Sequence, residues 1–321
     1  MTVSGMPFDD VRSLLQQISE PDRAAASAME DAFAGAGYAG EELGRMKGLA
    51  LWLAATRERV PPLIGKAGVA LYAATHGFSF AGRDVLADQR RRVDAVAAGA
   101  AAVSHLCVAN DLSLNVFDLA LDLPSGDITR EPALDERACA ATIAFGMEAT
   151  AEGGDLLCLG SLGEQADVAA LAVLTALLEV ASDGMPRDAL DVVERAVTAH
   201  EGHLHDPLEV LRRLGGRDIA ALTGAIVAAR MQQMPVILDG LPALAAAAVL
   251  HRLRPTAIAH CVLSGADHPV AVEVAARLHL EPLLALGLAE GGGCGAAMAA
   301  GVVKSAAVLA GGVAEIARRL S

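Results

Sequence analysis

Aromatic side chains are scarce in this sequence: they make up 3% of the 321 residues, with a single tryptophan. Hydrophobic residues nevertheless account for 54%, so the core must be assembled from alanine, leucine and valine. Basic residues are also few, 25 against 39 acidic ones, which leaves a net charge of −14. Because nucleic-acid binding is driven by clustered Lys and Arg, this balance argues against a nucleic-acid partner.

Long uninterrupted apolar runs are missing as well. Glu179, Glu290 and Lys304 interrupt the longest candidates before about 18 residues are reached, so no membrane span is expected. The five cysteines form no C-x-x-C pair and are odd in number, which is typical of reduced core thiols in a cytoplasmic protein. The first ten residues lack the basic and apolar regions of a signal peptide. A cytoplasmic location is therefore predicted.

Several signature motifs are absent too. There is no G-x-S-x-G elbow, no Walker A loop and no G-x-G-x-x-G after the first expected strand, so hydrolase and nucleotide-triphosphatase functions have no support. A run rich in potential metal ligands, residues 200–206, lacks compact zinc spacing with a partner pair elsewhere. It is expected to be a solvated loop between helices. Neither a metal nor a cofactor is predicted.

What the sequence does contain is an alternation of short apolar runs and helical segments over residues 63–312. Short apolar strands without polar alternation indicate a parallel sheet covered on both faces. Residues 1–62 are predicted to form a helical subdomain, and residues 313–321 the end of a last helix. The prediction is an α/β protein with a Rossmann-like, six-stranded parallel sheet, its strands at 68–74, 112–121, 155–159, 235–238, 257–263 and 283–288.

Ligands of such sheets lie beyond the carboxyl ends of the strands. The last strand leads into a glycine turn and an Ala-rich helix, an arrangement that favours an anion such as a phosphate. The alternative is a plain turn whose glycines only permit close packing. His76 either orients a substrate or makes a structural hydrogen bond, and Asp239 either meets the ligand or caps the next helix. The candidate site residues are His76, Gly160, Ser161, Gly163, Asp239, Glu290, Gly291, Gly292, Gly293 and Gly295.

Several segments resemble the nicotinate-nucleotide:dimethylbenzimidazole phosphoribosyltransferases of cobalamin lower-ligand assembly. They fall in that family's order and span about residues 65–312: 127–134 (DITREPAL), 152–163 (EGGDLLCLGSLG), 192–196 (VVERA), 206–224 (DPLEVLRRLGGRDIAALTG), 235–240 (PVILDG), 280–288 (LEPLLALGL) and the glycine turn. The resemblance implies a parallel-sheet domain with a small helical domain from the chain ends, assembled as a homodimer. It also implies exchange of the nicotinate of nicotinate mononucleotide for a benzimidazole, giving an α-riboside 5′-phosphate.

The chain departs from the family's motifs at positions that would meet substrate. The family's G-E-G-T-G turn carries the carboxylate that accepts a proton, but Gly292 stands at that glutamate and Glu290 lies two residues earlier. The family's G-E-M-G-I-G-N-T-T loop corresponds to residues 160–168 here, with Ser161 at its glutamate. A glycine cannot act as a base.

Two hypotheses follow. The first, which the extent of the resemblance favours, is a divergent phosphoribosyltransferase in which Glu290 is the base. In it, the turn glycines and Ser161 line the nucleotide. The second is a catalytically inactive paralogue that binds a nucleotide, an azole or a partner chain. The expected partners are a small nucleotide and an aromatic base, with a second copy of the chain.

Overall fold

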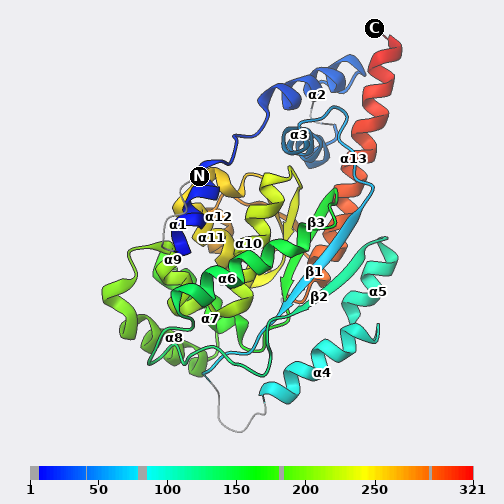
Figure 1. Cartoon of the computed structure of the whole chain (residues 1–321). Coiled ribbons are helices and arrows are strands. Elements are labelled where there is room, and N and C mark those ends of the chain that lie inside the picture. The colour runs from blue at the N-terminus through cyan, green and yellow to red at the C-terminus, as the bar shows by residue number, and fades with distance from the viewer. Residues whose placement is uncertain (1–6, 41, 79–84, 181–183, 289–290, 321) are drawn as a thin grey trace.

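Six parallel strands form one sheet in the order β2-β1-β3-β4-β5-β6 (Figure 1). The computed structural model describes residues 7–40, 42–78, 85–180, 184–288 and 291–320. The strands are β1 (Ala67–Ala73), β2 (Ser113–Asp118), β3 (Leu156–Ser161), β4 (Val236–Leu238), β5 (Cys261–Gly265) and β6 (Pro282–Leu284). The predicted six-stranded parallel sheet is confirmed.

The predicted strand bounds differ most from the structure at β5 and β6. β5 starts at Cys261 because Pro255–Ile258 forms a 3₁₀ turn, whose proline occupies the first turn and leaves no strand ladder there. β6 ends at Leu284, and the apolar residues that follow it leave the sheet, with Leu286 56% exposed. The apolar runs in the sequence did not indicate where β5 begins or where β6 ends.

Helices cover both faces of the sheet, as its apolar strands require. The helices are α1 (Pro7–Gln16), α2 (Arg23–Gly35), α3 (Arg45–Arg57), α4 (Val85–Ala97), α5 (Ala102–Ala109), α6 (Glu136–Gly146), α7 (Ala166–Leu178), α8 (Arg187–His200), α9 (Pro207–Val210), α10 (Gly216–Met231), α11 (Gly240–Leu253), α12 (Pro269–Arg277) and α13 (Cys294–Leu320). Successive residues of a strand point to opposite faces of the sheet and therefore pack in different cores. Tyr72 packs with α6, α7, α10 and α11, whereas Leu71 packs with α5 and α13.

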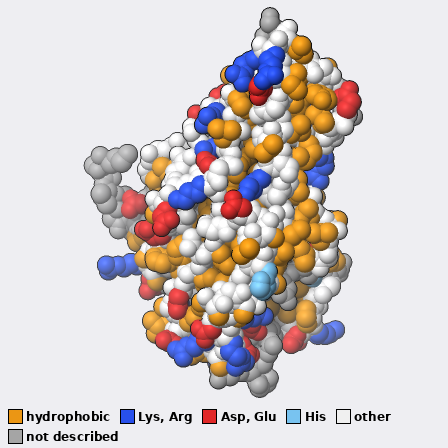
Figure 2. Space-filling model, turned by 90° about the vertical axis from the view of Figure 1, so that its right-hand side faces the viewer, with side chains coloured by type: hydrophobic (Ala, Val, Ile, Leu, Met, Phe, Trp, Pro, Cys, Tyr) orange, Lys and Arg blue, Asp and Glu red, His pale blue; other side chains and the backbone are white. Residues whose placement is uncertain are grey.

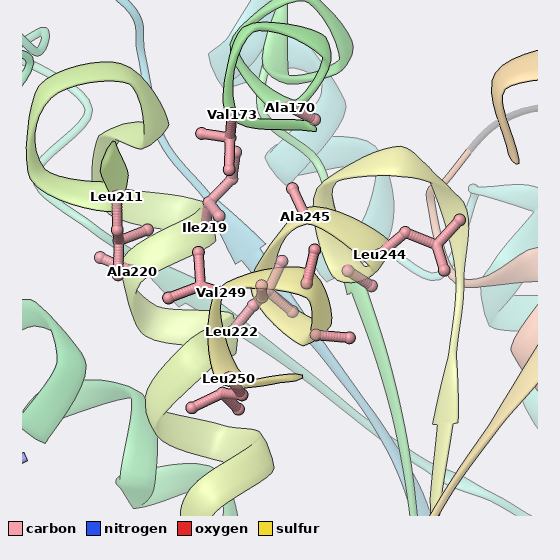
Figure 3. Packing of buried hydrophobic residues seen from close by; sticks show 14 of the residues in the cluster. Ala170, Val173, Leu211, Ile219, Ala220, Leu222, Leu244, Ala245, Val249 and Leu250 are labelled. Carbon is pink, nitrogen blue, oxygen red and sulfur yellow. The ribbon is translucent and has the colours of Figure 1, made fainter. Parts of the chain in front are cut away.

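Small residues let the helices approach closely. Figure 3 shows side chains of α7, α10 and α11 meeting in a core of alanine, valine, leucine and isoleucine. A methyl group on Gly224 of α10 would overlap the carbonyl of Ile143 in α6, and one on Gly146 would overlap that of Ala221. These two glycines therefore fix the α6–α10 distance, which is how a core with few aromatics is filled.

A smaller helical cluster joins the two chain ends. Met29 and Phe33 of α2, Ala50 of α3 and Val313 of α13 share a core separate from the sheet, and the three helices extend beyond one end of it in Figure 1. Helix α1 lies instead against α6 and the main core. The small helical domain from the chain ends is thus present, while the division at residues 62 and 312 stays a prediction.

Two described helical stretches, 85–109 and Cys294–Leu320, would be long and apolar enough to cross a membrane by length and composition alone. The first is divided between α4 and α5, with Gly99 in a left-handed conformation between them. Half of the most apolar window of α13 is buried within the protein, where it packs on the sheet. A buried core helix meets the same criterion, so the absence of a membrane span remains a prediction.

Candidate functional site

A cavity of about 540 Å³ lies at the carboxyl ends of β3, β4 and β5. This is the edge of a parallel sheet where ligands bind. A hollow of about 610 Å³ lies at the opposite edge, beside Trp52 and the first residues of β5, and we therefore take the carboxyl-end cavity as the candidate site. Its lining is Glu164, Gln165, Asp167, Val168, Gly184, Met185, Pro186, Asp188, Ala189, Asp239, Gly240, Leu241, Gly265, Asp267, His268, Ala271 and Leu288.

Of the site residues that were predicted from the sequence and that the structure describes, Asp239 is the one that lines this cavity. It follows β4 and is only 2% exposed. Its carboxylate accepts hydrogen bonds from the Ser264 hydroxyl and from the backbone N–H of Gly293, the latter at 2.9 Å. The N–H groups of Gly295 and Ala296 also point to it. The anion at the start of α13 is therefore the protein's own carboxylate.

Burial raises the pKa of Asp239 to about 6, although its hydrogen bonds from Ser264 and the backbone act in the opposite direction. A carboxyl group that titrates near neutrality can both hold and release a proton at physiological pH. Asp239 is consequently a residue of the cavity lining whose carboxyl group can exchange a proton near neutral pH.

The glycines of the turn serve close packing. A methyl group on Gly160 or Gly240 would overlap the backbone of Gly291, and one on Gly295 would overlap the Asp239 carboxylate. The Ser161 N–H donates to the Gly291 carbonyl at 3.0 Å. The turn is thus clamped between the ends of β3 and β4. Gly292 differs, because a methyl group there would contact only Leu162, at 3.9 Å.

A second buried carboxylate, Asp218 of α10, was missed by the sequence analysis. It is fully buried and accepts a 2.8 Å hydrogen bond from the Ser161 hydroxyl, which itself accepts one from the Gly163 N–H at 2.8 Å. His76 Nε2 lies 3.5 Å from the other Asp218 oxygen, and neither ring nitrogen of His76 has a hydrogen-bond partner. The usable signal was an aspartate within the helical stretch GGRDIAALTG, which the sequence analysis used only as part of the resemblance to the family.

The structure therefore divides the predicted site residues into groups. His76, Ser161 and Gly163 gather around Asp218, whereas Gly160, Gly291, Gly293 and Gly295 surround the Asp239 turn. Glu290, the predicted base, lies outside the described residues.

The cavity wall is acidic. Glu164, Asp167, Asp188, Asp239 and Asp267 contribute five carboxyl groups, and the described lining holds no Lys or Arg. Glu164 is 7% exposed; its N–H donates to Gln89 at 2.7 Å, and its carboxylate lies 3.4 Å from Arg92 Nε. Sequence reasoning did not single out Glu164 and Gln165, although they lie within residues 160–168, because the residues of that loop differ from those of the family's motif.

Within the parts of the chain that the structure describes, no three His, Cys, Asp or Glu side chains are placed to hold a metal. In the run 200–206, His200 is buried and its Nε2 pairs with the Ile128 carbonyl at 3.0 Å. Its pKa is lowered, chiefly by burial. The expectation of a wholly solvated loop was wrong at this residue, because the end of α8 packs against the segment that carries Ile128.

Comparison with known proteins gives concordant matches. A family model described as "Phosphoribosyltransferase" matches residues 18–318. Proteins named nicotinate-nucleotide–dimethylbenzimidazole phosphoribosyltransferase from Sinorhizobium fredii and Rhizobium meliloti are 46% identical over 99% of this chain and 98% of theirs. A crystal structure of the protein of that name from Thermus thermophilus superposes with a TM-score of 0.77 at 26% identity, covering 95% of each chain.

Proposed function

The chain belongs to the nicotinate-nucleotide–dimethylbenzimidazole phosphoribosyltransferase family, and from this premise we propose that it moves the phosphoribosyl group of nicotinate mononucleotide to a benzimidazole-type base. The product is an α-riboside 5′-phosphate of the kind used as a cobalamin lower ligand. The observation that carries the proposal is the 46% identity to enzymes of that name along 99% of the chain. The cavity at the carboxyl ends of the strands supplies a place for the reaction.

The exchange breaks the C1′–N bond to nicotinate and forms one between C1′ and a ring nitrogen of the incoming base. The attacking nitrogen supplies its lone pair, and the N–H on the other ring nitrogen loses its proton as the new bond forms. A carboxylate within reach of that N–H therefore accelerates the step, typically by about 10²–10⁴-fold. Asp239 lines the cavity and titrates near neutrality. Glu290 is the other candidate, on the sequence pattern alone.

The test is release of nicotinate from nicotinate mononucleotide by the purified chain, with and without dimethylbenzimidazole. Acceptor-dependent release is expected. Glu290→Gln and Asp239→Asn then identify the base. The variant whose turnover falls by about 10²-fold or more, while it still binds nucleotide, has lost the carboxylate that accepts the proton. Folded protein that releases no nicotinate with any azole would overturn the proposal and leave the inactive paralogue.

We further propose that two copies associate through the face made by α5 and α13. Figure 2 shows hydrophobic side chains gathered along this face with few charges among them. Val108 is 83% exposed, Val308 76% and Leu320 71%, and exposed apolar patches mark interaction surfaces. Val308→Asp should convert a dimer into a monomer in light scattering, whereas Val272→Asp on α12 should not. A monomeric parent protein would contradict the proposal.

We propose a cytoplasmic location because the cysteines are unpaired and mostly buried. All five are free thiols, and Cys107, Cys139, Cys158 and Cys261 are buried. Burial raises the pKa of each of these four thiols, which keeps them protonated and unreactive. Fractionation of the native host, with the protein followed by antibody, tests the location.

A further inference from the structure

Asp218 lies just after a break in a long helical stretch of the chain. Between α9 and α10, Leu211–Gly215 forms a π-helix, and Gly216 follows it with φ +81°. Such π-helical turns are rare and frequently occur at functional sites. A methyl group on Gly216 would come within 2.7 Å of the His76 ring, so the break requires glycine. The break places Asp218 in the first turn of α10, where its carboxylate meets the end of β3.

The surroundings of Asp218 are costly for the fold. The residue is fully buried, and a buried carboxylate loses its solvation by water. Its carboxylate accepts hydrogen bonds from the backbone N–H of Ile219, at 3.0 Å, and from the Ser161 hydroxyl, at 2.8 Å. The buried ring of His76 lies beside it with both nitrogens unpaired. Buried polar groups that stay incompletely paired are rare, and they mark strained or functional places in a fold.

Ser161 connects this carboxylate to two segments of the candidate site. Its hydroxyl has one proton, and because that proton is donated to Asp218, the oxygen accepts from the N–H of Gly163, at 2.8 Å. Gly163 begins the loop whose next residue, Glu164, lines the cavity. The backbone N–H of Ser161 donates to the Gly291 carbonyl of the glycine turn, at 3.0 Å. Asp218 therefore reaches both the loop and the turn through a single residue.

The family's loop motif has a glutamate where this chain has Ser161, and here a carboxylate of α10 lies at that place instead. We propose that Asp218 is a positioning residue of the candidate site: it holds Ser161, and Ser161 holds the loop 163–165 and the glycine turn where the reaction needs them. The inference rests on the proposed function, because it assigns a residue that supports that transfer without touching the substrate.

The first experiment measures hydrogen exchange of backbone amides in the full chain by mass spectrometry. Ser161→Ala removes the hydroxyl that Asp218 holds and leaves the backbone intact. It should raise amide exchange about 10-fold or more in peptides that cover 159–168 and 291–298, because both segments lose their anchor. Peptides from α6 should exchange at the parent rate.

Two further variants separate positioning from packing. Thr223→Val is the matched control, because it removes a fully buried hydroxyl that bonds the Ile219 carbonyl within α10, at 2.8 Å. Both segments should exchange at the parent rate in this control. The reciprocal exchange, Ser161→Asp combined with Asp218→Ser, keeps a hydroxyl and a carboxylate together and reverses their places. It should return both segments toward the parent rate, whereas Asp218→Ala alone should not.

Nicotinate release by the same variants tests the consequence for the reaction. A displaced loop and turn misplace the reacting groups, so Ser161→Ala should lower kcat by about 10- to 100-fold. KM should stay within about 2-fold, because Ser161 is not among the described residues that line the cavity. The reciprocal exchange should recover kcat, and Thr223→Val should keep it. An equal fall of kcat in Ser161→Ala and Thr223→Val would assign packing alone and overturn the inference.

The two proposals fail separately, because amide exchange is measured without turnover. Parent rates of amide exchange in Ser161→Ala would overturn the role of Asp218 whether or not nicotinate is released. Faster exchange with unchanged kcat would overturn it as well. Faster exchange in Ser161→Ala, in a protein whose parent form releases no nicotinate, would remove the transferase and keep Asp218 as the residue that holds the loop and the turn.

Discussion

The carboxylate of Asp239 accepts a 2.9 Å hydrogen bond from the backbone N–H of Gly293, and this pairing occupies the start of α13. Free N–H groups at a helix start attract anions, and here β4 supplies the anion from within the chain. A substrate phosphate that approached this turn would meet a carboxylate already bound there. The turn therefore fixes the position of Asp239 at the cavity wall.

Asp239→Asn should change how stability varies with pH. Burial raises the folded-state pKa to about 6, above the ordinary value of 3.8. A raised carboxyl pKa stabilises the fold below the unfolded pKa, and that contribution is lost as pH rises through the folded one. Between pH 4.5 and 7.5 this group alone should lower the unfolding free energy by about 2 kcal/mol. Urea unfolding of parent and variant measures the difference, and parallel pH profiles would contradict it.

Gly292→Glu should raise turnover. The position is partly buried, and a methyl group there would contact only Leu162, at 3.9 Å, so the fold has room for a side chain. The resemblance to the family's turn assigns the proton-accepting carboxylate to this position, and the expected gain is about 10²-fold.

Nicotinate release under saturating substrate measures the effect of Gly292→Glu. Gly48→Glu, on α3 where a methyl group would meet nothing within 4 Å, is the control for added charge. Equal rates in parent and Gly292→Glu would show that another carboxylate already performs this step.

Gly224→Ala should destabilise the protein strongly. Its methyl group would overlap the Ile143 carbonyl across the α6–α10 contact, and forcing such helices apart costs about 1–3 kcal/mol or more. Gly311→Ala provides the matched substitution in open space, where alanine should add about 0.5–1 kcal/mol through helix propensity. Chemical denaturation of both variants measures whether each substitution lowers or raises the free energy of unfolding. A Gly224→Ala variant as stable as the parent would show that α6 and α10 can separate freely.

The sheet was predictable because each strand is an apolar run that must be buried on both faces, and Asp239 was predictable because it directly follows one of them. Asp218 was not, since its partners Ser161 and His76 come from β3 and the end of β1 and meet it only after folding. Most residues of the cavity wall could not be predicted from the sequence either. Glu164 and Asp267 lie in the loops that follow β3 and β5, and Asp188 lies in the first turn of α8. No local pattern records that these three segments converge.

Gln165→Gly should make the free protein more stable, which is the opposite of what glycine does at most positions. At φ +67° glycine avoids a conformational cost of about 1–2 kcal/mol that other residues bear, and it removes an unpaired buried amide. Gln165→Ala separates the two effects, because it removes the amide and keeps the Cβ atom. Urea denaturation should rank the stabilities Gly above Ala, with Ala equal to or above the parent. An alanine variant more stable than the glycine variant would show that the backbone at 165 bears no strain. The predicted order would instead mean that the chain retains glutamine at the expense of stability.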